Sequence, residues 1–184
     1  MVNFLYIMIF FIAFSFSEEL VDDISKKKKI YIPNLNFKDL DNKKIIFKEF
    51  YKQSPILVNF WTLSCEPCKK EMLHLSKINE EYSDSVFKVI SINMDTPRTI
   101  KKVKQFVNSQ KYSFDVISDP RMELFRKIGG SVMPLVVLIN MDGSIEKRHV
   151  GYNPGDEIKL AKEVSDLIVS NGLIINLKDS TELD

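Results

Sequence analysis

The chain has 184 residues and a formal net charge of +1, from 26 basic and 25 acidic side chains. This length suits one domain, and the balanced charge excludes the large basic excess of a typical nucleic-acid-binding protein. With 45% hydrophobic and 28% charged residues, the chain is neither disordered nor an integral membrane protein, and two cysteines exclude a scaffold of several disulfides.

An apolar run opens the chain. Residues 4–16 are apolar except for Ser15, and the first charged residue is Glu18. As a helix the run would span about 20 Å, short of the ~30 Å hydrocarbon core of a bilayer. Its length fits a signal peptide with small residues at the cleavage site, although no Lys or Arg precedes it. We predict a signal peptide over residues 1–17, rather than a buried helix, and an extracytoplasmic location in a periplasm or on the outer side of a membrane.

Strand and helix patterns alternate after a polar tether at residues 18–29, which ends in four lysines. Apolar or alternating runs predict strands at residues 34–37, 44–47, 56–61, 86–93, 114–117, 135–139 and 145–150. Apolar residues spaced by three or four predict helices at residues 66–82, after Thr96-Pro97, after Asp119-Pro120, and over a last segment that ends at Asn171-Gly172.

The order of these elements predicts an α/β fold. Helices between strands imply parallel crossovers, whereas Asp142-Gly143 predicts a closing hairpin with antiparallel strands. We expect a mixed sheet with helices on both faces, preceded by a β-hairpin. The domain should cover residues 30–172, followed by a tail at residues 173–184.

The two cysteines form the sequence Cys65-Glu66-Pro67-Cys68 between a buried strand and a helix. Free backbone N–H groups at a helix start stabilise a thiolate, so this position suits a redox-active dithiol. A structural zinc site would need a second pair of ligands, which the sequence lacks. A haem-attachment motif would need a histidine after the second cysteine, where this sequence has Lys69. A static disulfide is the alternative that the spacing leaves open.

The sequence N-F-W-T-L-S-C-E-P-C-K-K-E-M at residues 59–72 resembles the active-site segment of the TlpA/ResA branch of thioredoxin-like proteins. The resemblance covers residues 34–170, including a helical insertion near residues 99–108. It implies a thioredoxin-like fold and an exported thiol–disulfide oxidoreductase. Two residues depart from the family pattern, Ser64 for Trp and Leu135 for Thr, and we expect both to alter the surface around the thiol.

The resemblance also assigns roles to single residues. It makes Cys65 the nucleophile and Cys68 the resolving thiol, and it implies a cis bond before Pro134, which faces the disulfide in this fold. Glu71 shares a helical face with Cys68, and the resemblance implies that its carboxylate handles protons for the thiols. Glu66, between the cysteines, disfavours the thiolate and so favours a reductant. His74 and His149 are expected to be isolated surface or hairpin residues, and Trp61 to pack under the active site.

The predicted function is therefore reduction of disulfides in extracytoplasmic proteins such as apocytochrome c. We expect no cofactor, no nucleic acid, a monomer, a disulfide-bearing protein substrate and a transmembrane thiol donor. A peroxiredoxin-like peroxidase is an alternative, favoured by Thr62 but not by Val58, where a proline is expected. A copper chaperone that uses the same cysteines is another, since thiolates suit Cu(I).

Overall fold

A computed structural model describes residues 29–82 and 85–174. The chain divides into two compact units, Met1–Ile30 and Tyr31–Asp184, and the second contains all the helices and strands described here. The predicted signal peptide, most of the polar tether and most of the C-terminal tail lie outside the described residues. Within the described ranges, no helix combines the length and the apolar character needed to cross a bilayer.

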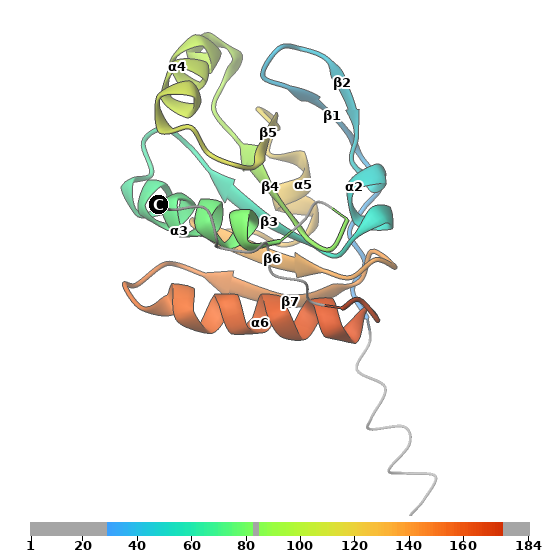
Figure 1. Ribbon diagram of the computed structural model, residues 1–184. Helices are drawn as coiled ribbons and strands as arrows, with labels where there is room; N and C mark the ends of the chain where they lie inside the picture. Colours follow the sequence, from blue (N-terminus) through green and yellow to red (C-terminus); the bar gives the residue numbers. More distant parts are fainter. Residues whose placement is uncertain (1–28, 83–84, 175–184) are drawn as a thin grey trace, which may run out of the picture. The chain divides into compact units, whose positions relative to one another are not determined.

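In this part of the chain, seven strands form one sheet in the order β2-β1-β5-β4-β3-β6-β7 (Figure 1). The strands are β1 (Asn36–Asp39), β2 (Lys44–Ile46), β3 (Ile56–Trp61), β4 (Lys88–Asn93), β5 (Asp115–Ser118), β6 (Leu135–Ile139) and β7 (Ile145–Val150). The helices are α2 (Lys48–Gln53), α3 (Glu66–Glu81), the 3₁₀ turn η1 (Pro97–Thr99), α4 (Ile100–Gln110), α5 (Glu123–Lys127) and α6 (Asp156–Ser170).

The strand directions confirm the predicted mixed sheet. β3, β4 and β5 are parallel, as helical crossovers require. β6 runs antiparallel to β3, and the closing hairpin joins β6 to β7 in antiparallel fashion. The N-terminal hairpin enters the same sheet, because β1 pairs antiparallel with β5 as well as with β2.

Helices cover both faces of the sheet (Figure 1). One core cluster packs β3 side chains such as Val58 and Phe60 against α2 and α5, and the other packs Leu57 and Trp61 against α3, α4 and α6. Every residue of β3 is buried, which explains its nearly continuous apolar sequence. The cysteines therefore follow a fully buried strand, which gives them a rigid support.

Helix α2 was not predicted from the sequence. It has six residues, too few for a helical period to stand out. Its position is fixed by aromatic packing: the ring centroid of Phe47 lies 5.5 Å from that of Phe37 and 6.1 Å from those of Phe50 and Tyr51. The contact between Phe37 of β1 and Phe47, the N-cap residue of α2, thus stabilises a helix that would be marginal alone.

Candidate active site

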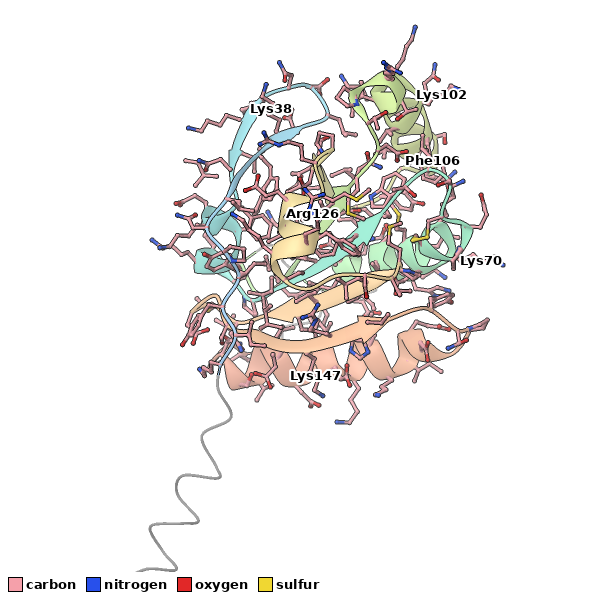
Figure 2. The ribbon with its side chains drawn as sticks, turned by 180° about the vertical axis from the view of Figure 1, so that it is seen from behind. Lys38, Lys70, Lys102, Phe106, Arg126 and Lys147 are labelled. Atoms are coloured by element: carbon pink, nitrogen blue, oxygen red, sulfur yellow. A yellow bond between two sulfur atoms is a disulfide. The ribbon has the colours of Figure 1, made fainter. Side chains whose placement is uncertain are left out.

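Cys65 and Cys68 are joined by a disulfide at the start of α3, with their Cα atoms 5.3 Å apart (Figure 2). Cys65 is the N-cap residue, and its Sγ accepts a hydrogen bond from the backbone N–H of Cys68 at 3.3 Å. Pro67 lies within the first helical turn, where it removes no needed donor. Once the disulfide opens, the same N–H and the helix dipole will stabilise a thiolate on Cys65.

The two sulfurs differ in access and in surroundings. Cys65 is partly exposed, whereas Cys68 is 0% exposed. The Cys68 Sγ lies 3.9 Å from the carbonyl oxygen of Phe60, an acceptor to which a reduced thiol can donate. A carbonyl oxygen and burial both favour the neutral thiol over the thiolate. Cys65 is therefore the more accessible sulfur and Cys68 the interior one.

In the reduced protein, we expect Cys65 to react with iodoacetamide about tenfold or more faster than Cys68 near pH 7, because alkylation requires an exposed thiolate. Mass spectrometry of peptides from briefly treated protein measures the two rates, and the same reaction in urea is the control, where the rates should converge. Equal rates in the folded protein would contradict the assignment of the two roles.

Asp95, which was not predicted as a site residue, holds the turn that carries Cys65. Its Oδ2 accepts hydrogen bonds from the backbone N–H of Leu63 at 2.7 Å and from the side-chain amide of Asn93 at 2.8 Å. The carboxyl ends of the parallel strands β3 and β4 meet at one edge, so a polar residue just after β4 was a usable signal. Ser64 is exposed and bonds to the Thr62 hydroxyl, with an oxygen–oxygen distance of 3.1 Å.

The first turn of α3 carries a compensated charge pair. The Nζ of Lys69 lies 2.7 Å from the Oε1 of Glu66, so the carboxylate between the cysteines acts on the thiols less than the sequence suggested. Lys69 also lies over the Phe106 ring, 5.4 Å from its centroid. Phe106 of α4 packs on fully buried Trp61 with the ring centroids 5.6 Å apart, which confirms that Trp61 packs beneath the active-site turn.

Pro134 directly precedes β6, and the Met133–Pro134 bond is cis, as the resemblance implies. Because Phe60 pairs with Leu135, Pro134 lies at the same sheet edge as the end of β3. Its carbonyl oxygen accepts a hydrogen bond from Gly151 N–H at 2.8 Å. Leu135 is 1% exposed, so the expectation that it alters the surface around the thiol is wrong: its side chain enters the core.

Glu71 lies on the buried face of α3 together with Cys68, as the i, i+3 spacing predicts. The residue is 5% exposed, and its Oε2 atom has no hydrogen-bond partner. Burial, followed by the nearby negative charge of Asp156, raises the pKa of Glu71 to about 8 in this disulfide-bonded state. Near neutral pH the side chain is therefore mainly a neutral acid with a proton to give.

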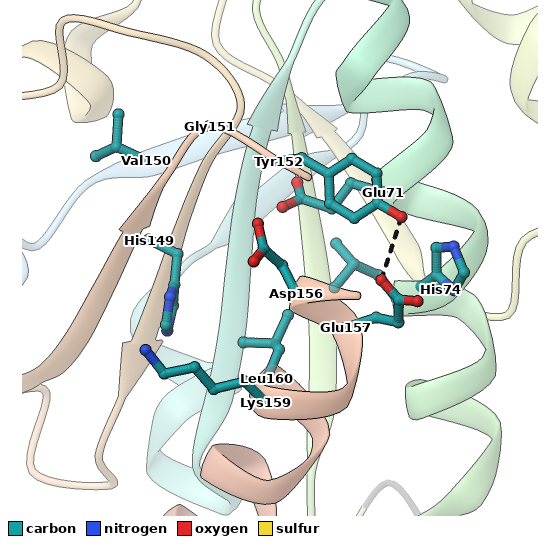
Figure 3. A pocket seen from close by; sticks show the side chains of 11 residues that line it. Glu71, His74, His149, Val150, Gly151, Tyr152, Asp156, Glu157, Lys159 and Leu160 are labelled. Carbon is teal, nitrogen blue, oxygen red and sulfur yellow. Dashed lines mark hydrogen bonds between the residues drawn. The ribbon is translucent and has the colours of Figure 1, made fainter. Parts of the chain in front are cut away.

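A pocket with a volume of about 100 Å³ adjoins Glu71 (Figure 3). It is lined by Glu71, His74 and Leu75 of α3, by residues 149–152, and by Asp156, Glu157, Lys159 and Leu160 of α6.

The two histidines of the pocket are not isolated, contrary to the sequence-based expectation. The His74 ring lies against Tyr152 with the centroids 5.9 Å apart, and the His149 Nε2 lies 2.6 Å from the Oε2 of buried Glu163. These partners come from distant parts of the chain, which local sequence patterns do not show. Within the described residues, no group of three or more His, Cys, Asp or Glu side chains is placed to hold a metal ion.

Comparisons with known proteins agree with this geometry. The Redoxin family model matches residues 26–166. Thiol-disulfide oxidoreductase ResA of Halalkalibacterium halodurans is 30% identical over 135 residues, 73% of each chain. Sporulation thiol-disulfide oxidoreductase A of Bacillus subtilis is 26% identical over 109 residues, 59% of this chain and 66% of that protein.

A solved structure supports the fold. The putative thiol:disulfide interchange protein DsbE of Chlorobium tepidum superposes with a TM-score of 0.70 at 22% identity, covering 78% of this chain and 99% of the other. The chain belongs to the Redoxin family and is a thioredoxin-like thiol–disulfide oxidoreductase of the TlpA/ResA type.

Proposed function

We propose that this oxidoreductase works outside the cytoplasm as a reductant of protein disulfides, with apocytochrome c as its substrate class and a transmembrane dithiol protein as its electron donor. The observation that carries the proposed exchange is the unequal cysteine pair: an accessible Cys65 at the helix start and an enclosed Cys68. An accessible thiolate attacks a partner, and an enclosed thiol releases it. The predicted signal peptide supports the location.

The reaction takes two exchanges. The Cys65 thiolate attacks a substrate disulfide, so that a mixed disulfide forms and one substrate sulfur leaves as a thiolate that takes a proton. The Cys68 thiol then loses its proton and attacks the Cys65 Sγ, which releases the second substrate sulfur and closes the disulfide seen here. Two electrons pass to the substrate, and a donor dithiol restores the reduced pair by the reverse sequence.

Glu71 is proposed to supply and accept the proton of these exchanges. It lies one helical turn after Cys68 on the same buried face, and a carboxyl group with a pKa of about 8 exchanges protons readily near neutral pH. Pro134, at the sheet edge beside the end of β3, is proposed to border the bound substrate segment. Both residues would then belong to the catalytic site with Cys65 and Cys68.

Replacing Cys68 with alanine should trap the substrate, because the mixed disulfide on Cys65 can no longer be resolved. The Cys68→Ala protein, expressed in its native cells, is expected to carry disulfide-linked partners that a reducing agent releases. The proposal predicts proteins with a C-x-x-C-H haem-attachment sequence among them, identified by mass spectrometry of purified adducts.

The matched control is Cys65→Ala/Cys68→Ala, which should capture nothing. Adducts that consist only of cytoplasmic proteins would contradict the location, and adducts without haem-attachment sequences would contradict the substrate class. Turnover of hydrogen peroxide by the unaltered protein would instead favour a peroxidase, and stoichiometric retention of Cu(I) by its reduced form would favour a copper chaperone.

A further inference from the structure

The Glu71 carboxyl group has an unusual electrostatic setting in its pocket. Its Oε2 atom is buried without a hydrogen-bond partner, and the side chain is 95% withdrawn from solvent, since 5% is exposed. The titratable or charged residues that line the same pocket are His74 on α3, His149 and Tyr152 on β7 and the loop after it, and Asp156, Glu157 and Lys159 on α6.

The basic side chains of the pocket lie against carboxylates other than Glu71. His149 Nε2 lies 2.6 Å and Lys159 Nζ lies 3.9 Å from Glu163, whose side chain faces β7. The charge of His74 acts on Glu157, which also accepts a hydrogen bond from the Tyr152 hydroxyl at 3.2 Å. Neither attraction compensates an ionised Glu71.

Asp156 is the remaining charged group that acts on Glu71. The backbone N–H of Asn153 donates to its Oδ2 at 2.7 Å, which fixes the carboxylate at the start of α6. Figure 3 shows this carboxylate directed toward Glu71 across the pocket. After burial, its charge is the second cause that raises the pKa of Glu71.

We propose that Asp156 is a positioning residue of the redox site, whose fixed negative charge keeps a proton on Glu71 while the disulfide is closed. The inference rests on the proposed proton-handling role of Glu71. When a donor thiolate attacks the Cys65 Sγ, a new sulfur–sulfur bond forms and the Cys65–Cys68 bond breaks. The electron pair leaves on the Cys68 Sγ, which takes the proton from Glu71 and leaves a carboxylate. Asp156 thereby prepares the oxidised protein for recharging.

The test compares Asp156→Asn with Glu157→Gln, which removes a carboxylate from the same helical turn and the same pocket. Carbon NMR of labelled glutamate carboxyl groups in the oxidised protein measures the Glu71 titration, with Glu71→Gln identifying its signal. Asp156→Asn should lower the midpoint by about 0.5 pH unit or more, while burial keeps it above that of an ordinary glutamate. Glu157→Gln should leave the midpoint in place.

The rate of disulfide opening by dithiothreitol gives a second measurement. Rates are corrected for the fraction of dithiothreitol that is thiolate at each pH. At about pH 8 the rate for Asp156→Asn should be about twofold lower than that of the unaltered protein. At about pH 6 the two rates should be equal, because Glu71 is then protonated in both proteins. In a Glu71→Gln background, Asp156→Asn should change nothing further. Asp156→Ser, which keeps an oxygen at the helix start, replaces Asp156→Asn if the latter does not fold.

The outcomes separate the two proposals. An unchanged Glu71 midpoint in Asp156→Asn would overturn the role of Asp156 alone. Opening rates that are identical in Glu71→Gln and the unaltered protein at every pH would overturn the proton-handling role on which it rests. A slower rate in Asp156→Asn that persists in the Glu71→Gln background would also overturn the inference, because the effect would not pass through Glu71.

Discussion

Replacing Glu71 with glutamine is expected to stabilise the oxidised protein increasingly as the pH rises from about 5 to about 8. The pKa of Glu71 is about 8 in the folded state and 4.5 for an ordinary glutamate. Between these values the folded protein holds a proton that the unfolded chain has lost, so the free energy of unfolding falls as the pH rises, by at most about 1.4 kcal/mol per pH unit. Glutamine, which is neutral at every pH, removes this loss.

Urea unfolding of both oxidised proteins at several pH values measures the effect. The difference between their free energies of unfolding should grow by about 2–4 kcal/mol from pH 5 to pH 8. Glu81→Gln, at an exposed position of the same helix, is the control. Its free energy of unfolding should change with pH in the same way as that of the unaltered protein. If the difference in free energy of unfolding between Glu71→Gln and the unaltered protein did not change with pH, Glu71 would be ionised in the folded protein. That result would also contradict proton donation by Glu71 near neutral pH.

Replacing Asp95 with alanine is expected to destabilise the domain by about 1–3 kcal/mol, because the N–H of Leu63 and the amide of Asn93 lose a partly buried acceptor. Disulfide exchange should also slow, since the turn between β3 and Cys65 loses its anchor to the neighbouring strand. Thermal or urea unfolding gives the stability, and reduction of an insulin disulfide by the reduced protein gives the exchange rate.

Two further variants show whether the effect of Asp95→Ala comes from the lost hydrogen-bond acceptor. Asp95→Asn keeps an acceptor oxygen without the charge, and it should retain more stability than Asp95→Ala. Asp166→Ala removes an exposed carboxylate that pairs with Lys162 at 3.0 Å, and it should cost no more than about 0.5 kcal/mol. If Asp95→Ala behaves like Asp166→Ala in both stability and exchange, the turn does not depend on Asp95.

Local patterns predicted the scaffold and the chemistry well. The apolar run of β3 and the apolar residues of α3, spaced by three or four, are the residues that these elements bury. Such patterns can be seen directly in the sequence. The position of Cys65 at a helix start follows from the same boundary, and the spacing of Cys68 and Glu71 places them on one helical face. Helix α2 was not predicted because its six residues are too few to show a helical spacing of apolar residues. An aromatic contact between its N-cap residue Phe47 and Phe37 of β1 stabilises it instead.

The sequence by itself determined the order of the strands and of the helices other than α2, the reactive pair and the residue that shares a helical face with Cys68. Only the tertiary structure decided which groups surround them. The Asp95 carboxylate accepts a hydrogen bond from Leu63, 32 residues earlier, and the charge of Asp156 acts on Glu71 although four strands, two α-helices and the 3₁₀ turn η1 lie between them in the chain. The periodicity of apolar residues indicates whether a side chain is buried, because burial repeats along a single helix or strand. The charged neighbours of that side chain, and hence the direction in which its pKa shifts, depend on how separate elements pack together.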